Sequence, residues 1–150
     1  MNKDDYYMNI ALKEAKKAYK KAEVPVGALI VIDNKIIAKA HNLRENKNNI
    51  INHAELIAIK KASKKKKNWR LDNSVMYVTL FPCPMCASAI MQSRIKKIVV
   101  GAPTKDLKNK EIVHMIFDGN TINPSIEIKE NVLKTECMQI LGSFFKERRN

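Results

Sequence analysis

Apolar residues recur at helical spacing in five segments of the chain and at strand spacing in five others. The segments with helical spacing are 4–21, 53–65, one that begins near Pro84, 111–117 and 132–149. The segments that alternate, or that are rich in β-branched residues, are 26–32, 36–40, 75–80, 97–102 and 125–130. These patterns predict five helices and five strands.

The order of the predicted elements indicates the fold class. It runs α-β-β-α-β-α-β-α-β-α, and the sequence Asp-Asn-Lys at 33–35 predicts a turn into a return strand. Helices that alternate with strands in this way cover both faces of a sheet. We therefore predict an α/β fold, a three-layer α/β/α sandwich around a mixed sheet of about five strands. The length of 150 residues suits one domain that spans residues 1–150.

The charge of the chain favours a polyanionic partner. The formal net charge is +13, and lysines gather at Lys16, Lys17, Lys20 and Lys21 and again in a run at 64–67. Such clusters are either solvated faces or contacts for a phosphate backbone, and composition does not decide between the two.

The sequence predicts a cytoplasmic protein without a membrane segment. No apolar run approaches the roughly 18 residues that a spanning helix needs. The first 23 residues contain early acids and no apolar signal core. Three cysteines are an odd number in such a chain. In the reducing cytosol, neighbouring cysteines more often bind metal or act in catalysis than form a bridge.

Two of the cysteines, Cys83 and Cys86, stand at the start of a predicted helix. Pro84 suits the first helical position, so both sulfurs can converge near the helix N-terminus. A helix N-terminus favours anionic groups and lowers the pKa of thiols. Three interpretations share this chemistry: a redox pair, a structural zinc knuckle, and part of a catalytic metal site.

The residues around His53 favour the catalytic metal site. His53 and two thiolates give three zinc ligands, which leaves the fourth position open for water, whereas structural zinc is normally closed. Glu55 stands two residues further on and is the candidate proton carrier. We do not expect it to be a fourth ligand, since positions i and i+2 of a helix do not share a face. The pattern H-x-E…P-C-x-x-C is the signature of zinc-dependent base deaminases.

Further stretches carry a more specific resemblance. They are EVPVGALIV at 23–31, HN at 41–42, MCASAIMQSRIKKIVVGA at 85–102 and ECMQILGSFFKERR at 136–149. Together they make nearly the whole chain similar to the bacterial tRNA-specific adenosine deaminases, which have a cytidine deaminase-like fold. The last stretch sets the chain apart from guanine deaminases and free cytidine deaminases, which share the metal motif.

Three departures from the family pattern lie near the mouth of the predicted site. Phe81 stands where the family has Glu in TLEPC, residues 49–52 replace Asp-Pro-Thr-Ala, and the loop at 103–110 lacks the family's glycine. Residues i and i+2 of a strand share a face, so we expect Phe81 to point with Thr79 and to border the pocket. None of the departures removes a metal ligand or the proton carrier.

The resemblance implies hydrolytic deamination of adenosine to inosine at the wobble position of tRNA, with one Zn²⁺ per subunit and a homodimer as the working form. It implies that an anticodon stem-loop is the partner. The candidate substrate contacts are Asn42, the backbone of Ala54, Phe145 for base stacking and Arg148 for phosphates, although aromatic residues of a closing helix more often belong to the core. Two alternatives remain: a deaminase of a free base or nucleoside, of the guanine or cytidine type, and a non-catalytic zinc-stabilised RNA-binding module.

Overall fold

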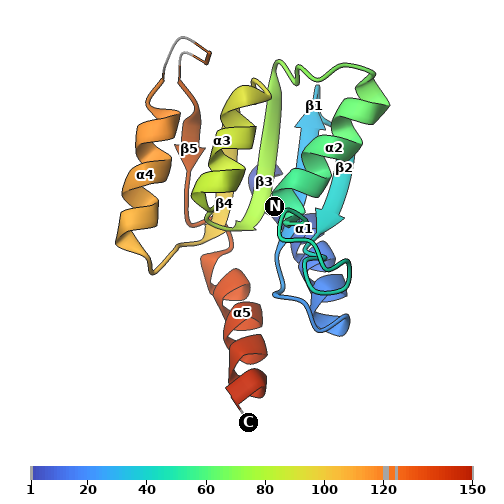
Figure 1. The fold of residues 1–150 in the computed structure, drawn as a ribbon, viewed down its shortest axis with the longest axis vertical. Coiled ribbons are helices and arrows are strands. Elements are labelled where there is room, and N and C mark those ends of the chain that lie inside the picture. Colours follow the sequence, from blue (N-terminus) through green and yellow to red (C-terminus); the bar gives the residue numbers. More distant parts are fainter. Residues whose placement is uncertain (1, 120–121, 124, 150) are drawn as a thin grey trace.

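A computed structural model describes residues 2–119, 122–123 and 125–149, and of residue 149 only the backbone. Ten elements follow one another in the predicted order (Figure 1). They are α1 (Lys3–Lys20), β1 (Gly27–Ile32), β2 (Lys35–His41), α2 (Ala54–Lys66), β3 (Ser74–Leu80), α3 (Pro84–Gln92), β4 (Lys97–Ala102), α4 (Leu107–Phe117), β5 (Glu127–Lys129) and α5 (Lys134–Arg149).

The five strands form one mixed sheet in the order β2-β1-β3-β4-β5. Strand β1 pairs antiparallel with both β2 and β3, whereas β3, β4 and β5 are parallel. The parallel half follows from the helices α3 and α4, because a crossover helix returns the chain to the same end of the sheet. The predicted mixed sheet is confirmed.

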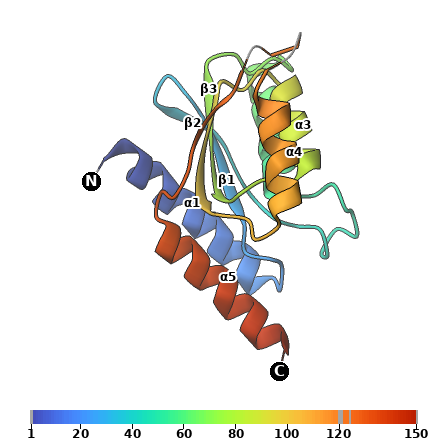
Figure 2. The same ribbon diagram turned by 90° about the vertical axis from the view of Figure 1, so that its left-hand side faces the viewer.

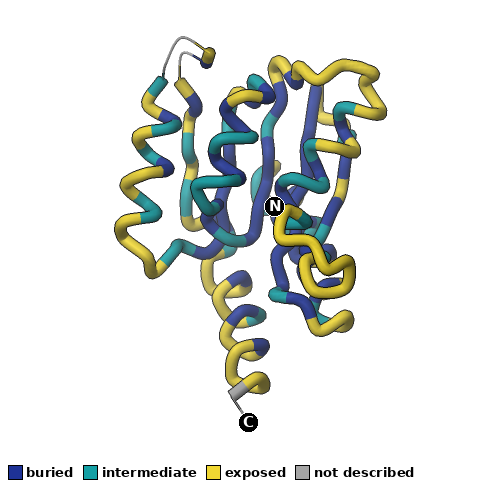
Figure 3. Tube along the Cα trace, viewed as in Figure 1, coloured by how far each residue is buried: buried dark blue, intermediate teal, exposed yellow. Residues whose placement is uncertain are grey.

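Helices cover both faces of the sheet, so the three-layer sandwich is confirmed (Figure 2). Alternation along β1 sends Ala28 and Ile30 into the core under α2, α3 and α4, and Leu29 and Val31 into the core under α1 and α5. Figure 3 shows the consequence, with buried strands between helices that expose one side. In the described parts of the chain, no helix is both long enough and apolar enough to cross a bilayer.

Three boundaries differ from the prediction. Helix α4 begins at Leu107 and not at 111, because Asp106 caps it by accepting a hydrogen bond from the backbone N–H of Asn109 at 3.1 Å. Strand β5 is limited to Glu127–Lys129. Helix α5 begins at Lys134 and not at 132, since Asn131 and Leu133 have positive φ angles of 67° and 53°. The spacing of apolar residues does not reveal a polar first helical turn or residues with a positive φ angle.

Candidate active site

The N-termini of α2 and α3 carry the predicted metal ligands. His53 is the N-cap residue of α2 and Cys83 is the N-cap residue of α3. Neither side chain makes a capping hydrogen bond to its own helix, so both are available to point across the gap between the helices. Pro84 occupies the first turn of α3, and Cys86 lies one turn after Cys83 and is buried.

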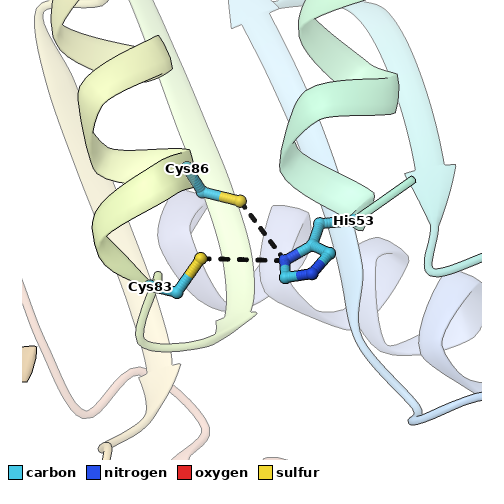
Figure 4. Close-up of side chains that lie close together, drawn as sticks. All are labelled: His53, Cys83 and Cys86. Carbon is cyan, nitrogen blue, oxygen red and sulfur yellow. Dashed lines mark hydrogen bonds between the residues drawn. The ribbon is translucent and has the colours of Figure 1, made fainter. Parts of the chain in front are cut away.

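These three side chains meet at one point (Figure 4). Nδ1 of His53 lies 3.8 Å from Sγ of Cys83 and 3.5 Å from Sγ of Cys86, and the three donor atoms lie within 4.8 Å of one another. Tetrahedral zinc with Zn–S of about 2.3 Å and Zn–N of about 2.1 Å places neighbouring donors roughly 3.6–3.8 Å apart. The donor types and their spacing therefore fit a tetrahedral zinc ion.

The electrostatics of the site favour an anionic sulfur at Cys83. A hydrogen bond from the Cys86 thiol, together with His53, lowers the pKa of Cys83 to about 4. The same hydrogen bond raises the pKa of Cys86, which is also buried. The pKa of His53 is raised, chiefly by its hydrogen bond to Cys83. The cluster thus holds negative charge at a helix N-terminus, where a divalent cation adds a countercharge.

Glu55 lies in the first turn of α2 and is 4% exposed. Burial raises the pKa of its carboxyl group to about 7. The Glu55 carboxylate is not part of the three-donor group, although Glu55 lines the same cavity as His53 and Cys83. A carboxyl group with such a pKa can both accept and donate a proton near neutral pH.

The cavity beside the donor group has a volume of about 150 Å³. Its lining comprises Val24, Val26, Asn42, Arg44, His53, Ala54, Glu55, Leu80, Phe81 and Cys83. The backbone N–H of Asn42 donates to the carbonyl oxygen of Val26 at 3.1 Å. Its side-chain Oδ1 is buried and has no hydrogen-bond partner among the residues that the structure describes. A buried amide oxygen without a partner is costly, and a ligand that donates a hydrogen bond there would satisfy it.

Comparison with known proteins identifies the family. The cytidine and deoxycytidylate deaminase zinc-binding region matches residues 1–102. A tRNA-specific adenosine deaminase of Bacillus subtilis (strain 168) is 44% identical over 149 residues, which cover 99% of this chain and 92% of the relative. The chain belongs to the tRNA-specific adenosine deaminase family.

Solved structures of deaminases share the fold of this chain. A tRNA:A34 deaminase, described as performing A-to-I editing at the wobble position of transfer RNA, has a TM-score of 0.83 at 32% identity, over 91% of this chain and 99% of that chain. A guanine deaminase from Bacillus subtilis has a TM-score of 0.66 at 32% identity, over 75% of this chain and 71% of that chain. The predicted resemblance and the cytidine deaminase-like fold are confirmed.

In this member of the tRNA-specific adenosine deaminase family, His41, directly before Asn42, belongs to a hydrogen-bonded network that the sequence does not reveal. His41 Nδ1 lies 3.1 Å from Oε1 of the buried Glu14, and His41 Nε2 lies 3.0 Å from Nζ of Lys21. An ammonium group only donates, so Nε2 accepts from Lys21 and Nδ1 donates to Glu14. The end of β2 is thus tied to α1, directly before Asn42.

A second anchor, also missed by sequence reasoning, holds the loop that follows Asn42. The fully buried Glu23 carboxylate accepts hydrogen bonds from the backbone N–H groups of Glu45 (3.1 Å) and Asn46 (2.6 Å) and from the Asn46 side-chain amide (2.5 Å). Burial alone would raise the pKa of Glu23, but these hydrogen bonds hold it below its usual value. They also place Arg44 at the cavity, which it lines.

Phe81 borders the cavity as expected, but it does not share a face with Thr79. Strand β3 ends at Leu80, so the alternation of side chains that would place Phe81 on the same face as Thr79 does not extend to Phe81. Phe81 belongs to the core under α2, α3 and α4, whereas Tyr77 at the alternate position of β3 faces α1 and α5. The ring of Phe81 packs 5.9 Å from that of His114, between centroids. The ring of Phe81 is therefore held at the cavity wall by packing contacts.

The structure places Phe145 and Arg148 in a second hollow of about 540 Å³, next to the first. Both hollows are lined by Val24 and Arg44. Phe145 is 46% exposed, while the neighbouring Phe144 is buried. Of the two aromatic residues, only Phe144 belongs to the interior, and Phe145 presents its ring to solvent.

Arg148 is held in place on this second hollow. Its guanidinium donates to the carbonyl oxygen of Ala22 at 2.7 Å and lies 5.0 Å from the ring centroid of Phe144. These contacts leave the side chain exposed at the rim. A fixed, exposed guanidinium is suited to bind a phosphate.

Proposed function

We propose that this protein deaminates adenosine to inosine at the wobble position of tRNA and that residues 1–150 act as one zinc deaminase domain with one Zn²⁺ per subunit. The observation that carries the proposal is the meeting of three zinc donors with a buried carboxyl group at a small cavity that contains an unsatisfied amide oxygen. The family relatives named as tRNA-specific adenosine deaminases support the substrate class.

The chemistry follows from the donors and from Glu55. His53, Cys83 and Cys86 would hold a zinc ion, which would supply the Lewis acidity that makes hydroxide available from water near neutral pH. Glu55 accepts a proton from the attacking water as the water oxygen bonds to C6, and it delivers that proton to N1 of the adenine ring. Glu55 then takes the proton of the new C6 hydroxyl and donates it to the amine, so that the C6–N bond breaks, the oxygen stays on C6 as a carbonyl and ammonia leaves.

The two hollows bind different parts of the RNA. The cavity of about 150 Å³ suits one base splayed out of a loop, as base chemistry requires. Asn42 Oδ1 and the backbone N–H of Ala54 are the polar groups we assign to this base. Phe145 and Arg148, in the second hollow, are positioned to stack on a neighbouring base and to contact a phosphate.

Replacing Asn42 with alanine should lower kcat/KM for a stem-loop substrate about tenfold to hundredfold, since a hydrogen bond to a buried oxygen is worth about 1–3 kcal/mol. The melting temperature should not fall, because the lost oxygen has no partner within the described protein. Steady-state kinetics and thermal unfolding check both parts. A destabilised variant with normal kinetics would assign Asn42 a purely structural role.

The function is tested with a panel of substrates: anticodon stem-loops with adenosine at the wobble position, free adenosine, cytidine, adenine and guanine. We expect inosine, measured by nucleoside analysis, in the stem-loops and no ammonia from the free compounds. Ammonia from guanine or a free nucleoside, with unchanged stem-loops, would favour a small-molecule deaminase. RNA binding without any turnover would favour the non-catalytic zinc module.

We further propose that the protein works as a homodimer in the cytoplasm. The outer side of α4 supports a dimer, because Leu107 and Met115 are 72% and 73% exposed. Exposed apolar side chains gathered on one helix indicate an interaction surface. Light scattering should give twice the mass of one chain, and a monomer at micromolar concentration would contradict the dimer.

A further inference from the structure

One side of α1 carries a row of lysines that the proposed reaction does not use. Lys13, Lys16 and Lys20 are exposed and follow one another at three and four residues, about one helical turn. Among the residues that the structure describes, none of the three forms an ion pair with an acidic side chain. Lys17 differs, because it pairs with Glu14 at 2.6 Å.

The lysine row borders the groove between α1 and α5. This groove has a volume of about 870 Å³, and Figure 2 shows the two helices side by side along the same face of the sheet. Three lysines of the row line it, and Glu136 is the acidic residue in its lining. Tyr6 and Tyr19 stand among the lysines. Positive charge therefore prevails along this groove.

The row ends beside the second hollow. Lys20 is followed by Lys21 and Ala22, which line that hollow. The helices are joined at the same point, where the Tyr19 ring packs on Phe144 with centroids 5.9 Å apart. Cationic groups thus continue from the rim of the second hollow along the surface of α1. An RNA whose loop occupies the two hollows would bring its stem toward one of the surfaces next to them.

The other lysine cluster has a different position. The run at 64–67 lies at the C-terminal end of α2, whose N-terminal end carries the metal ligand His53. Thirteen helical residues separate the two ends by about 20 Å. Figure 1 shows the C-terminal end of α2 at the top of the sheet, whereas the last turns of α5 extend below its bottom end. Among the described residues, none of the run at 64–67 lines either hollow.

We propose that Lys13, Lys16 and Lys20 bind phosphates of the double-helical stem of the RNA whose loop enters the active site. The inference rests on the proposed function and extends it to a surface on the opposite face of the sheet from the metal site. Lysines one turn apart on a helix act as point charges along a phosphate backbone and contribute affinity without reading the sequence. The run at 64–67 remains a solvated face.

The test compares two variants with the same change in charge. Lys13→Gln/Lys16→Gln/Lys20→Gln removes the row, and Lys64→Gln/Lys65→Gln/Lys66→Gln is the control. Glutamine is a good helix former, so both should fold. Fluorescence anisotropy between 50 and 200 mM salt measures Kd for an anticodon stem-loop and for a single-stranded oligonucleotide of the loop alone.

Removal of the row should raise Kd for the stem-loop at least tenfold at 50 mM salt. It should also reduce the slope of log K against log salt by about 2–3, as expected for three lost phosphate contacts. Kd for the loop oligonucleotide should stay within twofold of wild type, and the control variant should bind both RNAs normally. Equal losses in the two variants, normal stem-loop binding without the row, or equal loss of the loop oligonucleotide would each overturn the proposal.

Wild-type turnover separates this inference from the proposed function. Inosine in the stem-loop together with an unaffected row variant refutes the lysine row alone. Absence of inosine from every tRNA substrate refutes the proposed function, whatever the binding data show.

Discussion

A Glu55→Gln variant should deaminate a stem-loop substrate at least 10²-fold more slowly than wild type, and up to about 10⁴-fold, the range that general acid–base catalysis contributes. Glutamine has nearly the same shape, so the buried site should keep its packing. Its amide, however, cannot take a proton from water and pass it to the base. Single-turnover kinetics would measure the chemical step, and elemental analysis would measure zinc.

The zinc content of this variant should equal that of wild type, because Glu55 is not one of the three converging donors. RNA affinity should also be retained. A matched control is Glu127→Gln, which makes the same chemical change at an exposed position of β5. Turnover above half the wild-type rate in the Glu55 variant, or loss of zinc together with loss of rate, would assign the proton transfer to another group.

The sequence predicts the elements well where a periodic pattern is uninterrupted. β1 is the clearest case, since all six residues of Gly27–Ile32 are buried and its β-branched content permits little else. The boundaries fail where a few local interactions decide. Asp106 begins α4 in a polar stretch, and the left-handed Leu133 delays α5. Neither effect depends on apolar spacing.

The candidate site divides in the same way. The sequence alone predicts that His53, Cys83 and Cys86 share one site. Donor chemistry and the starts of helices are local properties, and the combined motif has few interpretations. That Asn42 Oδ1 has no partner in the described parts of the chain could not be predicted, since this depends on every atom around it. The same holds for the pairing of His41 with Glu14, which are 27 positions apart.

The two lysine clusters show what only the tertiary structure can decide. In the sequence they are equivalent, because each is a dense group of cations at the end of a predicted helix. In the structure, one adjoins α5, which follows it by more than a hundred residues, and the other caps the far end of α2. Polyanion binding is therefore a property of where a cluster lies, as the proposal for α1 assumes.

A Cys86→Ala variant should lose most of its zinc and at least 10³-fold of its activity. Two of three protein ligands remain, which is too few for a stable tetrahedral site with an open position. Without the metal, water returns toward its ordinary pKa, and little hydroxide is available near neutral pH. Elemental analysis after gel filtration gives the zinc content, and the stem-loop assay gives the rate.

Acidification should release zinc from the wild type, because protons compete with the metal for the imidazole and for both thiolates.

The control for the cysteine change is Cys137→Ala. Cys137 is equally buried, but it packs in the core under α1 and α5, on the opposite face of the sheet. Its loss should cost some stability and leave both zinc and turnover intact. Full zinc retention in Cys86→Ala with unaltered coordination would show that the metal has other ligands, and with them another site for the chemistry.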